Sequence, residues 1–363
     1  MHESSAEGLS LDTVLYLAEG GSVTIGDCAV GDRIMGADGK PTTITGKSGI
    51  FDTPMYELLL KDGRKLKVSD DHLNQVWLKT FHSNLAVRPT YTEATLTTRE
   101  LLDRNLILID SYRHRRPLVW IRFCQQLEFA GNTDQLIEPY TVGALIGDGS
   151  MNGKAAGQVP AVLIAHEDDW PTYEREIPYP LGKAYRGKRS PRVISRTIRD
   201  INAFVSVLGL STHGNYKRIP DVYLYGSVAQ RLAMLQGLMD TDGTCTVDGK
   251  CFFSSNSRVL VDQVMFLVRS LGGQASLNSR GKGGEIKHPK AYLRLYQPLF
   301  RLTRKLVRQR PPRDDKMALL QINRIPDEPS QSIAVDNAER QFVAGEFVRT
   351  HSSAPGLSRI LLL

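Results

Sequence analysis

Two segments of this chain repeat one pattern, and that repeat constrains the fold more than any other feature of the sequence. Each copy is an apolar stretch with glycine at its third position and Asp-Gly at its end: Thr141–Gly149 and Leu235–Gly243. The distance between the copies leaves room for one helix–hairpin unit of the αββ type and further helices in each half. The repeat therefore predicts two similar halves that share a helical seam.

The matched glycines predict how the two halves meet. Gly143 and Gly237 carry no side chain, so the two helices can approach until their backbones touch. Gly149 and Gly243 come where each helix should stop, at the position that a left-handed glycine often occupies. We therefore expect two closely packed helices, each ended by a left-handed glycine.

The repeat also brings two carboxylates together. Asp148 and Asp242 would lie at helix C-termini, where the helix dipole disfavours negative charge by about 0.3–1 kcal/mol, and pairing adds repulsion. A divalent cation would relieve both effects, and Mg²⁺ prefers carboxylate and carbonyl oxygens. The pattern predicts a Mg²⁺ site, suited to phosphodiester hydrolysis, whose ligands are Asp148, Asp242 and the carbonyls of Gly147 and Thr241. The alternative is an ordinary Asp-Gly turn after each helix, without metal.

The segments on either side of the repeat have a different character. Short strand patterns separated by Gly, Asp and Pro fill the first ~100 residues, and similar patterns return after Leu319. Between them, longer segments have the periodicity of amphipathic helices. A β-rich unit that is interrupted and then resumed indicates an inserted domain.

Composition narrows the class of protein. With 363 residues, of which 41% are hydrophobic and 23% charged, the chain is expected to fold into two or three domains. No apolar run approaches the ~20 residues of a membrane span and no signal-peptide start is present, so a cytoplasmic protein is expected. The formal net charge of +7 favours a polyanionic partner. The cysteines form no CxxC pair, which argues against a zinc ribbon or a disulfide scaffold: Cys28, Cys124, Cys245 and Cys251.

Basic residues gather in the predicted insert and directly before it. Arginine and lysine on strands can read bases in a major groove, and those on loops mostly contact phosphates. Beside a paired-carboxylate site these residues favour double-stranded DNA as the partner, and the alternative is a solvated charged face. The three clusters are Arg113, Arg115 and Arg116; Lys183, Arg186, Lys188, Arg189 and Arg192; and Arg280, Lys282, Lys287, Lys290 and Arg294.

Leu235–Gly243 resembles the motif of LAGLIDADG homing endonucleases, and Thr141–Gly149 resembles a diverged copy of it. The resemblance implies an α+β domain with pseudo-two-fold αββαββα repeats, whose sheets form a saddle over DNA. It implies that Asp148 and Asp242 are the catalytic metal ligands. It also implies a supporting lysine in each half, for which the candidates are Lys183 or Lys188 and Lys287 or Lys290.

The outer segments resemble the two parts of an intein splicing domain, a β-rich horseshoe of the Hedgehog/intein type. The resemblance implies that His72 protonates the leaving amide nitrogen at the N-terminal junction, with Ser69 hydrogen-bonding nearby. It implies that His351 assists cyclisation of the next residue, and that Ser353 is the first downstream nucleophile. Four motifs in the family's order carry the resemblance: Gly8–Thr13, Val68–His72, Ser332–Asn337 and Gln341–His351.

Departures from the intein pattern predict that splicing is blocked. Gly8 offers no nucleophile at the first position, and Ser332 stands where some inteins that lack one use a cysteine. Those inteins also have tryptophan at the position of Asn74, whereas their threonine is present here as Thr350. Ser352 replaces the terminal asparagine, and a hydroxymethyl group cannot form the succinimide that cuts the C-terminal junction.

These resemblances predict the domains: flanks at 1–7 and 353–363, a splicing domain from 8–118 and 319–352, and an endonuclease at 119–318. The predicted function is a blocked protein-splicing element that carries a Mg²⁺-dependent, site-specific double-strand endonuclease. Its partners would be the intein-free host gene and the flanking host segments in cis, and it would act as a monomer. The alternatives are a non-cleaving nucleic-acid-binding protein of the maturase or regulator kind and a Hedgehog-like autoprocessing module. Intact Asp148 and Asp242 favour the enzyme, and the insert argues against the Hedgehog-like module.

Overall fold

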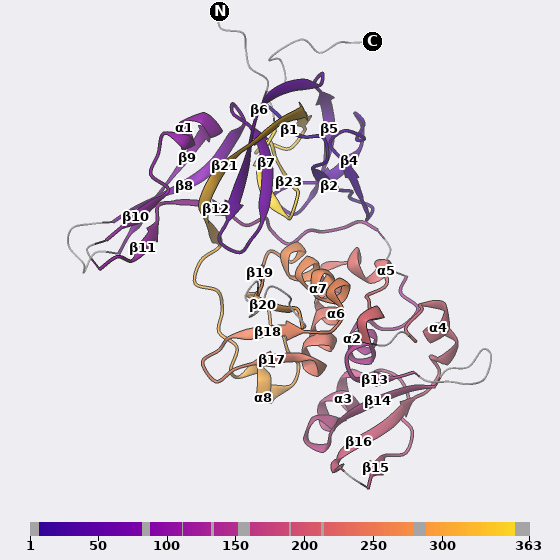
Figure 1. Cartoon of the computed structure of the whole chain (residues 1–363). Helices are drawn as coiled ribbons and strands as arrows, with labels where there is room; N and C mark the ends of the chain where they lie inside the picture. Colours follow the sequence, from indigo (N-terminus) through magenta and orange to yellow (C-terminus); the bar gives the residue numbers. More distant parts are fainter. Residues whose placement is uncertain are drawn as a thin grey trace, which may run out of the picture. The chain divides into compact units, whose positions relative to one another are not determined.

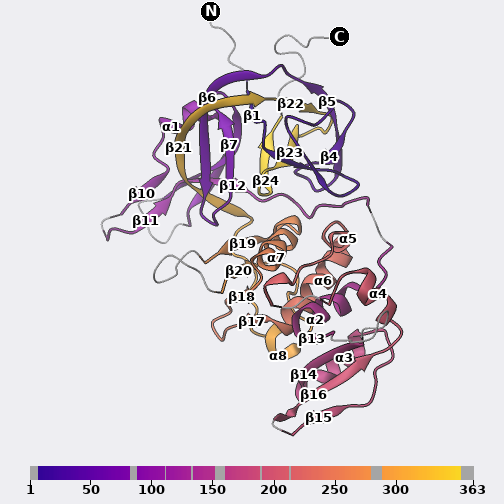
Figure 2. The ribbon, with the colours of Figure 1, turned by 45° about the vertical axis from the view of Figure 1, so that its right-hand side comes forward.

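Strands from both ends of the chain build one compact unit, and the segment between them builds a second. The computed structural model describes residues 7–81, 88–110, 112–131, 134–151, 160–188, 190–211, 214–278 and 288–352. The chain up to Ala130 and from Arg313 onwards forms the β-rich unit, and Gly131–Pro312 forms the mixed α+β unit (Figures 1 and 2). The predicted fold class, a β-rich domain interrupted by an α+β domain, is confirmed.

The β-rich unit centres on a sheet of seven strands. Their order is β1 (Leu9–Ser10), β7 (Lys65–Ser69), β6 (Phe51–Leu60), β21 (Lys316–Gln331), β12 (Val119–Arg122), β8 (Leu73–Thr80) and β9 (Thr90–Thr97), and β1 also pairs with β21. Smaller sheets are formed by β24 (Val348–His351), β23 (Gln341–Ala344), β2 (Val14–Tyr16) and β3 (Ser22–Thr24), and by β22 (Ile333–Val335), β5 (Pro41–Lys47) and β4 (Arg33–Met35). Helix α1 (Thr98–Leu102) precedes a separate hairpin of β10 (Ile107–Ile109) and β11 (Arg115–Pro117).

Strand β21 joins the two ends of the chain into one sheet. It pairs with β6 from Leu319 to Ser330, and the register shifts between Ile325 and Glu328, around Pro326. Proline has no N–H to donate to a ladder, so a β-bulge is a position where a strand tolerates it. Leu319 is fully buried in the core of this unit.

The insert begins later and ends earlier than the sequence predicts. Trp120 lies opposite Trp77 of β8 and Ala318 of β21, so β12 and the start of β21 belong to the β-rich unit. Their apolar residues were assigned to the insert from sequence because a short apolar run does not show which core will bury it.

The α+β unit contains two halves with the same strand order. The first sheet runs β13 (Gly149–Ser150), β14 (Ala161–His166), β16 (Ser190–Ile198) and β15 (Tyr185–Gly187), and the second runs β17 (Gly243–Cys245), β18 (Cys251–Ser254), β20 (Lys290–Arg294) and β19 (Gln274–Leu277). Helix α2 (Pro139–Asp148) directly precedes the first strand of the first sheet, and α6 (Val228–Thr241) precedes that of the second. Helix α3 (Trp170–Glu176) comes after β14 in the chain, and α7 (Arg258–Ser270) comes after β18. The remaining helices are η1 (Glu167–Asp169), α4 (Asn202–Val207), η2 (Gly214–Tyr216), α5 (Asp221–Leu224) and α8 (Thr303–Leu306).

Capping residues fix where the two central helices begin. The Glu138 carboxylate accepts from the backbone N–H groups of Tyr140 and Thr141, at 2.9 and 2.8 Å, just before α2. Ser227 and Gln230 form a capping box at the start of α6. Within the part of the chain described here, no helix is long and apolar enough to cross a membrane.

Candidate functional site

Helices α2 and α6 pack backbone to backbone at the glycines of the repeat. A Cβ atom on Gly143 would lie 2.4 Å from the carbonyl oxygen of Met234, and one on Gly237 would lie 2.2 Å from that of Tyr140. Both distances are far below van der Waals contact, so no other residue fits without moving a helix. The predicted close approach of the two helices is therefore present.

The glycines that end the helices have a different role from the predicted one. Neither Gly149 nor Gly243 is left-handed, and Gly149 has φ −79° and ψ 145°. A Cβ atom on Gly149 would lie 2.2 Å from the carbonyl oxygen of Leu145, and one on Gly243 would lie 2.5 Å from that of Met239. The prediction of left-handed caps is thus wrong. At each glycine the backbone passes from the helix directly into a strand, and the strand begins in contact with the last turn of that helix. Glycine is needed there for space.

The two aspartates of the repeat stand at the ends of these helices and act on each other electrostatically. Asp148 is the last residue of α2 and is exposed, and Asp242 caps α6 and is half-buried. Partial burial among backbone, followed by the charge of Asp242, raises the pKa of Asp148 to about 6. Burial also raises the pKa of Asp242, and the charges of Lys217 and Lys305 oppose that rise. The seam therefore holds two carboxylates whose negative charge is only partly compensated.

A lysine binds the carbonyl end of each of these helices. Lys217 Nζ donates to the carbonyl oxygen of Gly147 at 2.5 Å, next to Asp148. Lys305 Nζ is buried and donates to the carbonyls of Asp240 and Gly243, at 2.6 and 2.7 Å, with longer bonds to those of Met239 and Thr241. Burial lowers the pKa of Lys305 to about 8, although Asp240 and Asp148 work in the opposite direction. Both ammonium groups thus lie at the negative ends of helices.

The lysines named from sequence lie elsewhere. Lys183 and Lys188 are exposed near β15, and Lys290 lies on β20 with its ammonium 4.1 Å from the centre of the Phe252 ring. Lys287 lies outside the described residues. Sequence reasoning missed Lys217 and Lys305, although each follows its aspartate at a comparable distance along the chain. A search for basic residues at matched positions of the repeat could have found both.

The donor set at the seam suits a hard divalent cation. In the described parts of the chain, no group of three or more His, Cys, Asp or Glu side chains could hold a metal, which leaves the two carboxylates and nearby carbonyls. The raised pKa values of Asp148 and Asp242 indicate charge that a cation would offset. Mg²⁺ is commonly held by one or two carboxylates while it keeps several waters. The carbonyls of Gly147 and Thr241 already accept from lysine, but a carbonyl oxygen has a second lone pair.

The basic clusters of the α+β unit differ in how free their charges are. Arg186 and Arg192 both pair with Glu167, and Arg192 also pairs with Asp168. On β20, Lys290, Tyr292 and Arg294 follow a spacing of two and so share one face of the strand, on which Tyr292 and Arg294 are exposed. Four predicted DNA-contact residues lie outside the described residues: Arg189, Arg280, Lys282 and Lys287.

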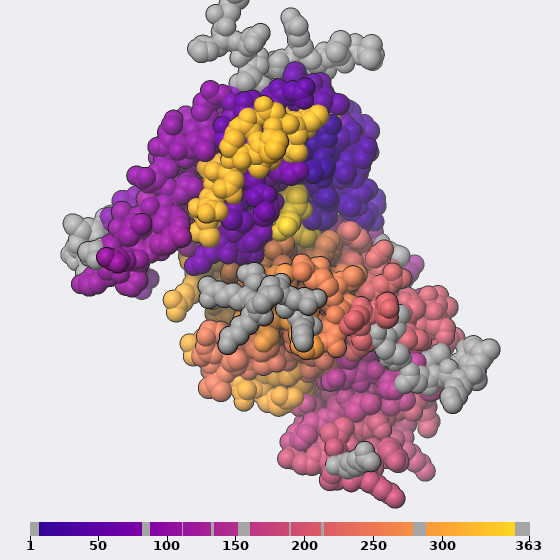
Figure 3. Space-filling model, in the orientation of Figure 1, coloured from indigo at the N-terminus to yellow at the C-terminus, as the bar shows by residue number. Residues whose placement is uncertain are grey.

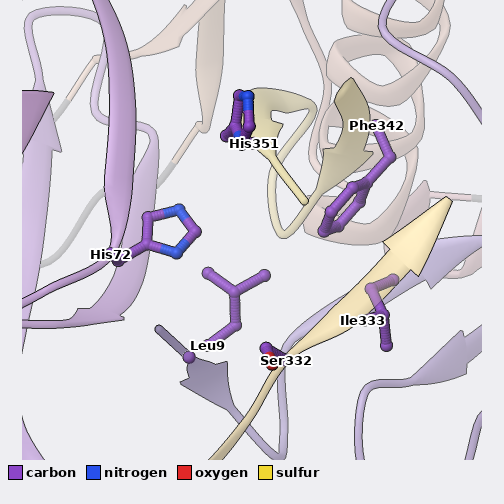
Figure 4. A pocket seen from close by; sticks show the side chains of 7 residues that line it. Leu9, His72, Ser332, Ile333, Phe342 and His351 are labelled. Carbon is purple, nitrogen blue, oxygen red and sulfur yellow. The ribbon is translucent and has the colours of Figure 1, made fainter. Parts of the chain in front are cut away.

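The β-rich unit has a small pocket where the resemblance to inteins places the splice junctions. Gly8, His72, Ser332 and His351 line it, from segments far apart in the sequence, together with Leu9, Ile333 and Phe342 (Figure 4). The backbone N–H of Gly8 donates to Ser69 Oγ at 2.8 Å, and the N–H of Ser69 donates to the Gly8 carbonyl at 2.9 Å. The structure thus brings the first position of the motif, Gly8, next to both histidines.

Both histidines of this pocket have a lowered pKa. His72 is buried with Nε2 2.7 Å from Thr350 Oγ1, and burial, followed by the charge of His351, lowers its pKa to about 3. Burial also lowers the pKa of His351. Asn74 faces the other way and donates to the His72 carbonyl at 2.9 Å, so it holds the backbone of that histidine.

Ser352, the predicted C-terminal junction, is tightly enclosed. Ser352 is 1% exposed, and its N–H donates to the Arg340 carbonyl at 2.8 Å. Among the described residues, Ser352 Oγ and His351 Nδ1 have no hydrogen-bond partner. Ser353 lies outside the described part of the chain. Two buried polar atoms of adjacent residues are therefore without a partner in this part of the described chain.

Comparison with known proteins gives two sequence matches. Residues 229–299 match the family described as the LAGLIDADG-like domain. The replicative DNA helicase DnaB of Mycobacterium intracellulare is 29% identical over 387 aligned positions, which cover 97% of this chain and 59% of that protein. The chain therefore spans about three fifths of the length of this curated relative.

Solved structures of similar proteins include both kinds of domain. The Msm DnaB1 intein splicing domain bound with zinc aligns with 95% of this chain and 99% of its own, at 12% identity and a TM-score of 0.27. The homing endonuclease I-DmoI in complex with DNA and Mn aligns with 44% of this chain and 89% of its own, at 11% identity and a TM-score of 0.30. Residues 229–299, which lie in the α+β unit, are thus similar to the LAGLIDADG-like domain.

Proposed function

We propose that this chain is an intein-type element, blocked in splicing, whose insert is a Mg²⁺-dependent endonuclease that cuts both strands of a specific DNA site. The observation that carries the proposal is the pair Asp148 and Asp242, set at the ends of two helices that cross at glycine. Binding DNA alone requires neither carboxylate, and a negative pair at a DNA surface would weaken binding unless a cation occupied it.

Each half of the seam would serve one DNA strand. Bound Mg²⁺ would lower the pKa of a water ligand and offset charge on the phosphate, with Asp148, Asp242 and the carbonyls of Gly147 and Thr241 as ligands. Lys217 and Lys305 fix the helix ends that carry the aspartates, and their charges favour an anionic phosphate nearby. With a pKa of about 8, Lys305 can also exchange a proton near neutral pH.

DNA affinity would come from basic residues of the two sheets. Lys290 and Arg294 share a face of β20, and Lys183 and Lys188 are exposed beside β15. The other proposed contacts are Arg189, Arg192, Arg280, Lys282 and Lys287. Since both halves of the seam belong to one chain, a monomer suffices for a double-strand cut.

The splice junctions would be inactive because they lack the reacting groups. Gly8 has no side chain to accept an acyl group, Ser352 cannot cyclise, and Ser332 is a weaker nucleophile than cysteine. His72 and Thr350 remain in contact, so the polar framework of the pocket persists without the reaction.

The similarity to DnaB supports a helicase of that kind as the host. Residues 1–7 and 353–363 would then be host segments, and the intein-free host gene would be the DNA target. A cytoplasmic location follows from that role.

A cleavage assay tests the endonuclease. The purified chain is incubated with Mg²⁺ and a plasmid that carries an intein-free coding sequence for a DnaB-type helicase, and the variants Asp148→Asn and Asp242→Asn are assayed beside it. We expect a double-strand cut by the parent and a loss of at least about 100-fold in rate for each variant, with DNA binding retained in gel shifts. If both variants cut as fast as the parent, the catalytic assignment is wrong. If the parent binds DNA but does not cut it in the presence of any divalent metal, the chain is a non-cleaving binding protein.

A further inference from the structure

One basic cluster lies outside the α+β unit. Arg113, Arg115 and Arg116 belong to the β10–β11 hairpin of the β-rich unit, which projects from its sheet (Figures 1 and 3). Ile109 lies opposite Arg115, and Leu108 lies opposite Arg116. Opposite residues of an antiparallel pair point to the same face, so each face of this ribbon combines an arginine with an aliphatic side chain.

The end of the hairpin is held in one conformation by a single acid. The Asp110 carboxylate accepts from the backbone N–H groups of Tyr112 and His114, at 3.0 and 2.8 Å, and from Arg116 Nε at 2.8 Å. The Arg113 N–H donates to the Asp110 carbonyl at 2.9 Å, and Arg113 itself is left-handed with φ 60°. Asp110 thus compensates Arg116 and shapes the turn.

The base of the hairpin is anchored by aromatic rings. Arg116 lies over the Phe81 ring, 5.4 Å from its centre, and Lys79 lies between the rings of Phe81, Tyr91 and Trp120 at 5.1–5.3 Å. The hairpin is therefore fixed where it leaves the sheet.

The charge that remains at the tip is positive and exposed. Arg113 and Arg115 are exposed, and in the described chain no carboxylate lies within ion-pair distance of either. Tyr112 is 80% exposed and Ile109 is 66% exposed. Large apolar side chains that project beside unpaired arginines suit a partner that is anionic and has apolar surface between its charges.

We propose that the β10–β11 hairpin is a second DNA-contact element, which enters a groove of the duplex outside the segment bound by the α+β unit. The inference rests on the proposed endonuclease function, which supplies the duplex. A two-stranded ribbon fits a major groove about 12 Å wide. Arg113 and Arg115 would contact phosphates, and Tyr112 and Ile109 would contact base edges such as the thymine methyl.

The test measures the salt dependence of binding to a fluorescent duplex by anisotropy. Arg113→Ala/Arg115→Ala is compared with the parent and with Arg33→Ala/Lys40→Ala, which removes two exposed charges from the hairpin of β4 and β5 in the same unit. Each phosphate contact contributes about 0.9 to the slope of log K against log salt, so the hairpin variant should lose about 2 from the slope. The control should keep the slope of the parent. Tyr112→Ala should weaken binding without changing the slope.

Hydroxyl-radical footprints on a long duplex that carries the cut site give the second readout. The hairpin variant should lose protection on one side of the site, whereas Arg33→Ala/Lys40→Ala should keep the footprint of the parent. Unchanged slope and footprint in a variant whose parent binds and cuts would overturn the inference and leave the endonuclease intact. A parent that neither binds nor cuts DNA would overturn the proposed function, and the inference with it.

Discussion

The helix seam and the junction pocket treat their reactive positions in opposite ways. At the seam, the groups next to the aspartates also hold the fold: Gly143 permits the helix contact, and Lys305 binds the end of α6. In the pocket, Gly8 and Ser352 form their hydrogen bonds through backbone atoms, which other residues also carry, although a Cβ atom on Gly8 would lie 2.8 Å from Ser330 Oγ. Chemistry at the junctions can therefore be lost without unfolding the β-rich unit, whereas losses around the seam would cost stability as well.

The largest effect is expected at the C-terminal junction. We expect the parent chain not to cleave there, and Ser352→Asn should restore cleavage at least partly, because His351 lines the pocket and the backbone of residue 352 is already held. Intact mass measurement would detect the released C-terminal segment. Ser352→Ala is the matched control and should stay uncleaved. An uncleaved Ser352→Asn chain that is folded would show that more than this side chain is missing.

A side chain at the seam should damage the fold strongly. Gly143→Leu puts a Cβ atom 2.4 Å from the Met234 carbonyl oxygen, so we expect a loss of about 3 kcal/mol or more from overpacking. Urea unfolding followed at Trp170, inside the α+β unit, would measure it. Gly187→Ala has open space around its Cβ and should change stability by less than about 0.5 kcal/mol. Equal effects of the two substitutions would remove the argument for a close seam.

The two lysines should separate structure from chemistry. Lys305→Met leaves buried carbonyls without their donor and should cost about 1–3 kcal/mol. Lys217→Met removes the hydrogen bond to the Gly147 carbonyl at a half-buried site and should cost about 1 kcal/mol or less. Both variants should slow DNA cleavage by a similar factor if both lysines support the reaction. A slow Lys305→Met beside an unimpaired Lys217→Met would assign the loss to stability.

The smallest effect concerns charge repulsion in the absence of metal. The folded pKa of Asp148, about 6, exceeds the ordinary value of 3.8, so the folded state binds more protons between these pH values. Its contribution to stability therefore falls as pH rises from about 4 to about 6. Asp148→Asn should raise the melting temperature at pH 7 by about 2–4 °C, a value reduced because the carboxylate reaches solvent. With Mg²⁺ added, the parent should have a higher melting temperature than Asp148→Asn.

The features that could be predicted from the sequence are those that depend on the repeat and on short motifs. The pattern at Thr141–Gly149 and Leu235–Gly243 predicts the helix contact, and the motif around His72 predicts a pocket that contains Gly8 and His351. These features depend on residue types at matched positions, which can be read directly from the sequence.

The missed features depend on contacts across the fold. Lys305 reaches the end of α6 from a helix far along the chain, and only its position relative to the repeat, not a local motif, distinguishes it from Lys290. The apolar residues of β12 are equally ambiguous until Trp120 is seen opposite Trp77. The prediction of left-handed caps at Gly149 and Gly243 is wrong because glycine occurs both where φ is positive and where two backbones are in close contact. The sequence does not distinguish these two situations, whereas the structure does.

The pairing of β12 with β21 also bears on how the chain folds. Arg122 lies opposite Lys316, so the insert leaves and rejoins the β-rich unit at adjacent residues of one ladder. Closing an unstructured loop on the order of 200 residues long would oppose this pairing entropically. An insert that folds first shortens that loop, and during synthesis it emerges before β21 does. The β-rich unit should therefore complete its sheet late, after the α+β unit, and mutations that slow folding of the insert should delay formation of a sheet they never touch.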